Sequence, residues 1–280
     1  MRGMTLIELV IVITLASIVV SFMSMFVIMP MNAYTAQTRR AKLSDAADSA
    51  LRLLSRDLRA ALPNSVRTAA SGSIVALELL ATVDGARYRD NGPLTDPTLW
   101  LDFSAPDGAF STTVPFLQVP LPFSSTNYYL AIYNVGVPGA NAYSMANVIT
   151  PANTQIGITA GASANVNMVT LSPAFQFSWG SPGKRVYLVS GPVSYLCDTT
   201  SGTLTRYNGY TINAAQFTTA ASLLAAGATA GLVATNVGNC IFNYTAGNAQ
   251  RAGLASLDLQ LSAGGEQVQL LHQVHLVNAP

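Results

Sequence analysis

The hydrophobic positions of the chain are concentrated in one uninterrupted run near the N-terminus, residues 9–29. The run holds no charged residue, and as a helix it would span roughly 30 Å, the thickness of the hydrocarbon core of a bilayer. A second apolar run, residues 222–234, is shorter and contains two glycines, so we expect a buried segment or a loop there. The pattern therefore predicts a single membrane-spanning helix within residues 4–29.

After Pro30 the apolar residues recur at spacings of three and four, which is the pattern of an amphipathic helix. These residues are Leu43, Ala47, Ala50, Leu54, Leu58 and Ala61. Pro30 is expected to kink the helix rather than end it, and Leu62-Pro63 is expected to end it. We therefore expect residues 30–62 to continue the first helix and to pack their apolar stripe against a globular head.

The charged residues of this second half are mixed in sign: Asp45, Asp48, Arg52, Arg56, Asp57 and Arg59. Their spacing, as between Asp48 and Arg52, suits ion pairs on a solvated helix face. The alternative is that some of them contact neighbouring subunits. Arg39, Arg40 and Lys42 flank one end of the apolar run and Arg2 the other, so a count of basic residues does not support a head outside the cytoplasm.

Residues 63–280 contain many short apolar or alternating segments separated by Gly, Pro and Asn, which predicts strands joined by turns. The expected strands cover 73–80, 128–135, 167–171, 175–179, 184–190, 193–197, 203–207, 254–261 and 267–277. The segments 193–197 and 203–207, and the last two segments, are expected to form hairpins. The fold class is therefore α+β, with a long N-terminal helix packed on an antiparallel β-sheet head, and inserted loops are expected at about 82–164.

The overall composition fits one apolar helix on a weakly charged head. Hydrophobic residues make up 50% of the 280 residues and charged residues only 10%, and the mean hydropathy is +0.36. The 14 basic residues nearly balance the 13 acidic ones, so no basic field is present to attract nucleic acid.

Candidate catalytic or metal-binding groups are scarce. His272 and His275 are three residues apart in an expected strand, so they point to opposite faces and are expected to be structural. Five aspartates lie in loop-like sequence and are expected to be exposed turn residues rather than a Ca²⁺ site: Asp84, Asp90, Asp96, Asp102 and Asp107. We expect no catalytic site, metal or cofactor, because the common hydrolase, nucleotide-binding and metalloprotease motifs are missing from the sequence.

The N-terminal residues carry a specific resemblance. Arg2-Gly3-Met4-Thr5-Leu6-Ile7-Glu8, followed by the apolar run, resembles the cleavage and methylation motif of type IV prepilins and type II secretion pseudopilins. In that family a peptidase cuts after the glycine, the new N-terminal residue is N-methylated, and a glutamate stands fifth in the mature chain. Glu8 is fifth counting from Met4; Met4 itself departs from the usual Phe. The alternatives are an ordinary membrane anchor, which gains nothing from a carboxylate such as Glu8 at the edge of its apolar run, and a cleaved signal peptide, which has an apolar region of only about 7–15 residues followed by a small-residue cleavage site.

The resemblance implies a type IV pilin-like fold with residues 1–3 as leader, cleavage between Gly3 and Met4, and methylation of Met4. It also implies that Glu8 pairs with the methylated amine of a neighbouring subunit and sets the register of assembly, with Thr5 and Leu6 beside it. The implied partners are the prepilin peptidase and methyltransferase, other major and minor pilins, and the assembly platform of the inner membrane. The implied location is the bacterial inner membrane, with a periplasmic head, and later the filament.

The segment 270–280 resembles the closing strand of larger minor pilins, and shorter matches at 58–66 and 189–198 resemble the O-type minor pilins of mannose-sensitive haemagglutinin pili. The implied function is a low-copy subunit for pilus initiation or assembly, placed at the tip by its large head. The alternatives are the J-type minor pseudopilin of type II secretion and a tip adhesin that binds a surface ligand. A membrane-anchored periplasmic enzyme is a weaker hypothesis, because no catalytic constellation supports it. Since the periplasm is oxidising, Cys197 and Cys240 are expected to form a disulfide; two buried reduced thiols are the alternative.

Overall fold

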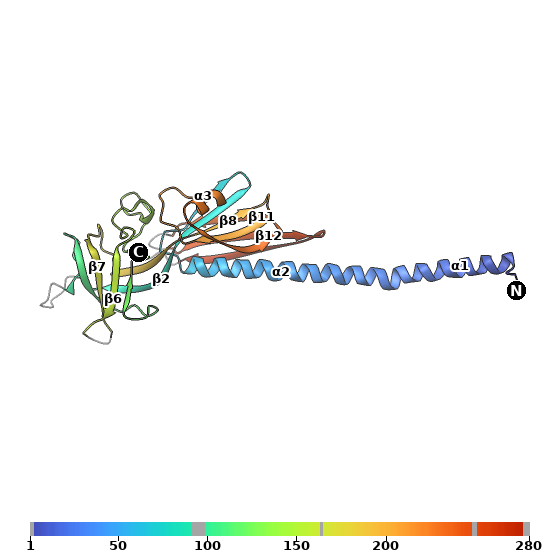
Figure 1. Ribbon diagram of the computed structural model, residues 1–280, viewed down its shortest axis with the longest axis horizontal. Coiled ribbons are helices and arrows are strands. Elements are labelled where there is room, and N and C mark those ends of the chain that lie inside the picture. Colours follow the sequence, from blue (N-terminus) through green and yellow to red (C-terminus); the bar gives the residue numbers. More distant parts are fainter. Residues whose placement is uncertain (1–2, 91–98, 163–164, 248–250, 277–280) are drawn as a thin grey trace.

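The computed structural model describes residues 3–90, 99–162, 165–247 and 251–276. A long helix carries the N-terminus far from a β-rich head, and the first half of this helix stands clear of the head (Figure 1). The chain therefore has the α+β layout that the sequence pattern predicts, with one long N-terminal helix and antiparallel sheets.

The helix runs without a break from Leu6 to Arg59. Its regular parts are α1 (Leu6–Met23) and α2 (Met29–Arg59), joined by a π-helical turn, η1 (Ser24–Ile28). Within η1 the N–H of Met29 bonds to the carbonyl of Ser24, five residues earlier. Pro30 follows directly, and because its ring crowds the preceding turn and lacks a donor, the wider turn accommodates it without ending the helix.

The helix ends at Arg59, before the Leu62-Pro63 boundary that the sequence suggested. The reason is a competing hydrogen bond, since the N–H of Leu62 donates to the carbonyl of Leu80 in the sheet at 2.7 Å. The last residues before Pro63 therefore join the head instead of completing another helical turn.

Within the described residues the head holds two sheets whose paired strands are all antiparallel. The larger sheet has ten strands, in the order β10-β9-β8-β2-β3-β7-β6-β4, with β1 on β2 and β5 on β8; the smaller has the order β11-β12-β13. The strands are β1 (Arg67–Ser71), β2 (Ile74–Tyr88), β3 (Asp107–Val114), β4 (Phe123–Ser125), β5 (Tyr129–Ala131), β6 (Gln155–Ala160), β7 (Asn167–Phe175), β8 (Arg185–Asp198), β9 (Thr203–Asn208), β10 (Thr229–Thr235), β11 (Val237–Thr245), β12 (Gly253–Ala263) and β13 (Glu266–Leu276). Two short helices, η3 (Ala142–Ser144) and α3 (Ala220–Ala225), lie in the connections.

The second half of α2 is the centre of the first hydrophobic core. The stripe expected from the sequence is buried at Leu43, Ala47, Ala50, Leu54 and Leu58, and Ala61 lies half-buried beyond the helix end. These side chains pack with apolar residues of β2 and β8 in the large sheet and of β12 and β13 in the small one. Both sheets therefore depend on α2 for their shared core.

A second core lies at the end of the head opposite to the N-terminus (Figure 1). It is formed by side chains from β2, β3, β6, β7 and β8, among them Tyr88, Phe110 and Val169. The stretch 82–164, where inserted loops were expected, supplies the end of β2 and all of β3 to β6. Together with β7 and the first half of β8, the insertion forms a lobe around this second core, and we call it the distal lobe.

Two prolines lie inside strands that the sequence divided. β8 continues through Gly191 and Pro192. One edge of β8 pairs with β2 throughout, and the other edge pairs with β5 up to Val189 and with β9 from Val193 onwards. Pro192 thus lies in the gap where no donor is needed. Pro173 likewise lies in β7, beside a register shift in its pairing with β3, so 167–171 and 175 belong to one strand. The two predicted hairpins, β8–β9 and β12–β13, are present as expected, apart from residue 277, which lies outside the described residues.

Candidate functional site

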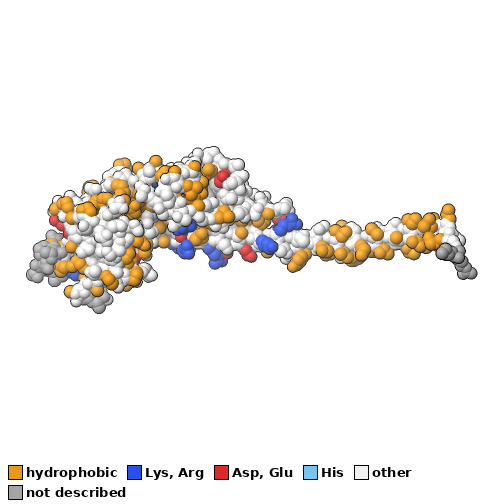
Figure 2. Space-filling model, in the orientation of Figure 1, with side chains coloured by type: hydrophobic (Ala, Val, Ile, Leu, Met, Phe, Trp, Pro, Cys, Tyr) orange, Lys and Arg blue, Asp and Glu red, His pale blue; other side chains and the backbone are white. Residues whose placement is uncertain are grey.

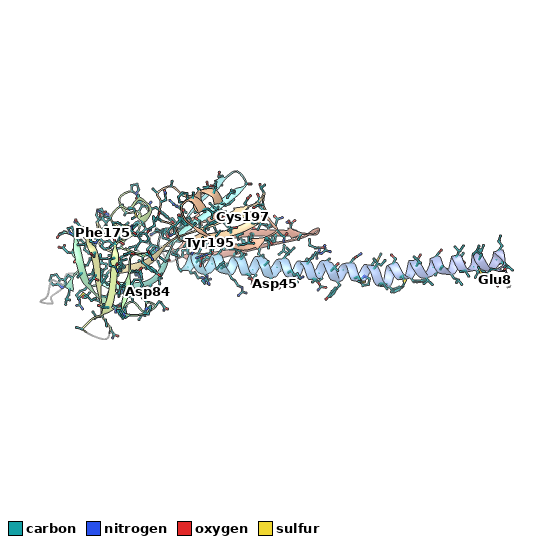
Figure 3. The ribbon with its side chains drawn as sticks, viewed as in Figure 1. Glu8, Asp45, Asp84, Phe175, Tyr195 and Cys197 are labelled. Atoms are coloured by element: carbon teal, nitrogen blue, oxygen red, sulfur yellow. A yellow bond between two sulfur atoms is a disulfide. The ribbon has the colours of Figure 1, made fainter. Side chains whose placement is uncertain are left out.

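The N-terminal motif lies at the free end of the helix, where Figure 3 places Glu8 farthest from the head. Gly3 and Met4 precede the helix without regular structure and are exposed. Thr5 caps α1 in a reciprocal arrangement: the Thr5 N–H donates to the Glu8 carboxylate at 2.9 Å, and the Glu8 N–H donates to the Thr5 hydroxyl at 3.4 Å. Gly3 and Met4, on either side of the predicted cleavage point, are therefore accessible, and the Glu8 carboxylate is held at Thr5, the residue after Met4.

The described part of α1 exposes every residue, and most of them are apolar. Figure 2 shows this hydrophobic surface along the whole of the projecting half of the helix. A helix that is apolar on all sides needs either a bilayer or other protein helices around it. Leu6–Arg59 is the one helix in the described part of the chain that is long and apolar enough to cross a membrane.

The hydroxyl groups within this apolar segment are already bonded to the helix backbone. Ser17 donates to the carbonyl of Ile13 at 2.8 Å and Ser21 to that of Ser17 at 2.9 Å. Thr14 donates to the carbonyls of Val10 and Ile11. Because these three hydroxyl groups of α1 each have an acceptor in their own helix, α1 can enter hydrocarbon without leaving them unpaired.

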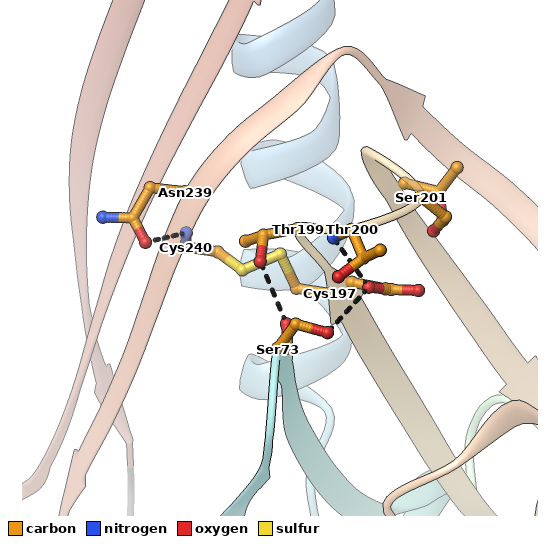
Figure 4. Close-up of a disulfide and its surroundings, with 9 residues drawn as sticks. Ser73, Cys197, Thr199, Thr200, Ser201, Asn239 and Cys240 are labelled. Carbon is orange, nitrogen blue, oxygen red and sulfur yellow. Dashed lines mark hydrogen bonds between the residues drawn. A yellow bond between two sulfur atoms is a disulfide. The ribbon is translucent and has the colours of Figure 1, made fainter.

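The predicted disulfide between Cys197 and Cys240 is present and joins the two sheets (Figure 4). Cys197 lies on β8 and Cys240 on β11, with 6.6 Å between their Cα atoms, and both are buried in the first core. The alternative of two reduced thiols is not what the structure has. The bond ties the large sheet to the small one within the core that both sheets share with α2.

Replacing both cysteines by serine is expected to lower the free energy of unfolding by about 2–4 kcal/mol, because the bond closes a long loop in the unfolded chain. The measurement is chemical unfolding of the full-length chain in detergent micelles, with and without reductant. Reductant should shift the wild-type midpoint towards that of Cys197→Ser/Cys240→Ser and leave the variant unchanged. A wild-type midpoint that does not move under reductant would contradict the prediction.

The two histidines lie on opposite faces of β13, as their spacing predicts. His272 is half-buried on the face that turns towards α2, and His275 is exposed on the other face. Their separation across the strand prevents joint binding of one metal ion. Among the residues described, no three His, Cys, Asp or Glu side chains are grouped closely enough to hold a metal.

Most of the aspartates that were expected in exposed turns accept hydrogen bonds from backbone N–H groups, but Asp84 lies in β2 and Asp107 begins β3, and both are half-buried, so the expectation of exposed turn residues is wrong for these two. Asp84 accepts hydrogen bonds from the N–H groups of Gly85, Gln118 and Val119, so it anchors a loop of the distal lobe to β2. Asp102 and Asp107 accept the N–H groups of nearby residues in the same way. Asp90 pairs with Lys184 at 3.5 Å. Asp96 lies outside the described residues.

A buried charged cluster that the sequence did not reveal joins α2 to the head. The Asp57 carboxylate accepts from the Tyr195 hydroxyl at 2.8 Å and from Arg206 Nε at 2.7 Å, and only 8% of Asp57 is exposed. Burial and the adjacent carboxylate raise the pKa of Tyr195 well above its usual range, so its hydroxyl stays protonated and donates. The expectation that Asp57 lies on a solvated face is wrong. Asp57 lies seven residues after Ala50 and three after Leu54, so helical spacing places it on the buried stripe. The sequence alone therefore indicated that Asp57 would be buried.

A second buried cluster lies on the opposite face of β2. Glu78 is fully buried and accepts from Nε and Nη2 of Arg67 at 3.0 and 2.9 Å, and from the Tyr210 hydroxyl at 3.3 Å. Burial raises the pKa of Glu78, while Arg67 acts in the opposite direction. The guanidinium of Arg67 also stacks over the Tyr143 ring at 3.6 Å. Arg67 also donates to the carbonyls of Asn213 and Ala214, so the cluster holds β1 and β2 to the segment after β9.

No family model, curated protein or solved structure matches the chain. The features of the chain that point to a function are therefore the N-terminal motif, the exposed apolar helix and the surface of the head.

Proposed function

We propose that the chain is a minor subunit of a type IV pilus that takes part in pilus initiation or assembly at the tip. The observation that carries the proposal is the Gly3-Met4-Thr5-Leu6-Ile7-Glu8 motif on an exposed end, followed by a helix that is apolar on every side. A helix of this kind suits first a bilayer and then a bundle of like helices. The subunit is non-catalytic in this proposal, and its partners are the prepilin peptidase, other pilins and the inner-membrane assembly platform.

Mass spectrometry of the mature N-terminus tests this function. In cells that carry a prepilin peptidase, we expect the chain to begin at N-methylated Met4. Gly3→Val is expected to leave the chain uncleaved, because the peptidase must grip a backbone without a side chain at that position. An intact Met1 in the wild-type protein, or a cut beyond residue 29, would overturn the proposal.

The distal lobe favours a second candidate function, a tip adhesin. It is a folded unit with its own core at the end of the molecule away from the membrane helix, which is where a surface ligand would be met first (Figure 1). Loss of adherence with an unchanged number of pili, on replacement of exposed residues of this lobe, would favour adhesion. Loss of the pili themselves would favour assembly, in a pilus or, for the J-type alternative, in a type II secretion pseudopilus.

A further inference from the structure

A groove of about 500 Å³ lies between the exposed flank of α2 and β13. Its lining comes from five residues of the helix and one of the strand: Asp48, Arg52, Ser55, Arg56, Arg59 and His272. Figure 2 shows Lys and Arg side chains gathered along α2 below the head. Three of the six lining residues are therefore arginines, although the chain as a whole is almost neutral.

The arginines of the groove are incompletely neutralised. Arg52 pairs with Asp48 at 2.6 Å, yet 75% of its side chain is exposed. Arg56 reaches Asp57 only at 3.5 Å, and that carboxylate is already bound by Arg206 at 2.7 Å. In the described part of the chain Arg59 has no hydrogen bond or ion pair. Arg59 is thus free to take a carboxylate from outside, and Arg56, whose side chain is 73% exposed, gives up only a long contact to do so.

The spacing of the arginines matches one kind of partner. Residues 52, 56 and 59 are separated by four and three positions, which corresponds to rises of about 6 and 4.5 Å along the helix axis. A second helix laid alongside presents side chains at i, i+4 and i+7 with the same two rises, whereas a strand presents them at a constant step of about 6.6 Å. A partner helix with acidic residues at these positions can therefore meet all three arginines, and guanidinium binds carboxylate through two parallel hydrogen bonds.

We propose that this groove docks an acidic helical segment of another subunit, with carboxylates at i, i+4 and i+7. The identity of the partner as a subunit rests on the proposed function; the preference for acidic helices rests on the groove alone. The buried Ser55 hydroxyl, which also lines the groove, donates to the carbonyl of Leu51 at 2.6 Å. Its proton is therefore already used, and the arginines are left to bind the incoming carboxylates. Binding is accordingly expected to weaken as salt concentration rises.

The test is binding of a labelled helical peptide to the full-length chain in zwitterionic nanodiscs, measured by fluorescence anisotropy. One peptide carries Glu at i, i+4 and i+7, and a matched peptide carries Gln there. We expect the Glu peptide to bind at least about tenfold more tightly, which corresponds to 1.4 kcal/mol. Arg56→Gln/Arg59→Gln should remove this difference. Arg87→Gln, which removes an exposed arginine of the distal lobe, should keep it.

Equal affinity for the two peptides would overturn the proposal, as would an equal loss of affinity in Arg87→Gln. Displacement of the Glu peptide by vesicles of anionic phospholipid or by inorganic phosphate at comparable concentration would assign the groove to phosphate groups and would also overturn it. Both replaced arginines are exposed, so an unchanged circular dichroism spectrum is expected for the double variant. A chain processed to methylated Met4 that fails to bind the Glu peptide refutes this inference alone; an unprocessed chain that binds it refutes the proposed function alone.

Discussion

If the chain is the pilus subunit proposed above, replacing Glu8 by alanine is expected to lower its incorporation into filaments at least about tenfold, the ratio to which 1.4 kcal/mol corresponds. Membrane insertion should stay normal or improve, because a carboxylate at the edge of the apolar run opposes insertion. The measurement is the ratio of the variant in sheared filaments to that in membranes, by quantitative immunoblot. The physical reason is that the Met4 amine and the Glu8 carboxylate would each be unpaired in an apolar bundle without the other.

The structure supplies a matched control for this experiment. In the single chain Glu8 also closes the first turn of α1 through Thr5, so alanine removes a helix cap as well as a charge. Glu8→Gln keeps an acceptor for the Thr5 N–H and removes only the charge. If pairing of charges sets the register, the glutamine variant fails to assemble as the alanine variant does. Normal assembly of Glu8→Gln would show that the cap, and not the charge, is what matters.

Features encoded by local spacing were predictable from the sequence. The apolar run and the stripe from Leu43 to Leu58 follow from helical periodicity, and the β12–β13 hairpin follows from alternation around Gly264-Gly265. The pairing of the cysteines follows from their number and from the implied compartment. The helix and the hairpin are each determined by residues that are close in the chain. The disulfide was predictable because each cysteine has only one possible partner in the chain.

Features decided by distant pairings were not predictable in the same way. Pro192 reads as the end of a strand, yet β8 continues through it because β5 and β9 leave a gap at that position. The distal lobe forms because β2 continues past Ala81, where its pairing with β8 contains two register shifts, and then pairs with β3. Glu78 reads as one polar residue in a strand, and only the fold brings Arg67 and Tyr210 to it.

The groove lined by α2 and β13 also combines features that the sequence predicts with features that only the fold creates. The sequence places Arg52, Arg56 and Arg59 on a helix and leaves open whether they are merely solvated or contact other subunits. What it lacks is the position of β13, which turns a helix face into a groove and brings His272 to its wall. It also lacks Arg206, whose bond to Asp57 leaves Arg56 with only a long contact to that carboxylate.

Asp57→Ala is expected to lower the free energy of unfolding by about 3–5 kcal/mol, the usual loss when one partner of a buried ion pair is removed. It would leave Arg206, whose side chain is only 26% exposed, and the Tyr195 hydroxyl without their acceptor, between α2 and the large sheet. The measurement is guanidinium unfolding of the full-length chain in detergent micelles, followed by circular dichroism.

Asp48→Ala is the matched control, because it removes the same side chain from an exposed pair on the same helix. The loss there should be at most about 0.5 kcal/mol. Adding Arg206→Met to Asp57→Ala should recover part of the lost stability, because the double variant no longer leaves a buried charge unpaired. Equal losses in Asp57→Ala and Asp48→Ala would show that the buried cluster does not hold the helix to the head. A large loss of stability that Arg206→Met relieves would show that the unpaired charge of Arg206, and not the lost packing of Asp57, causes the destabilisation.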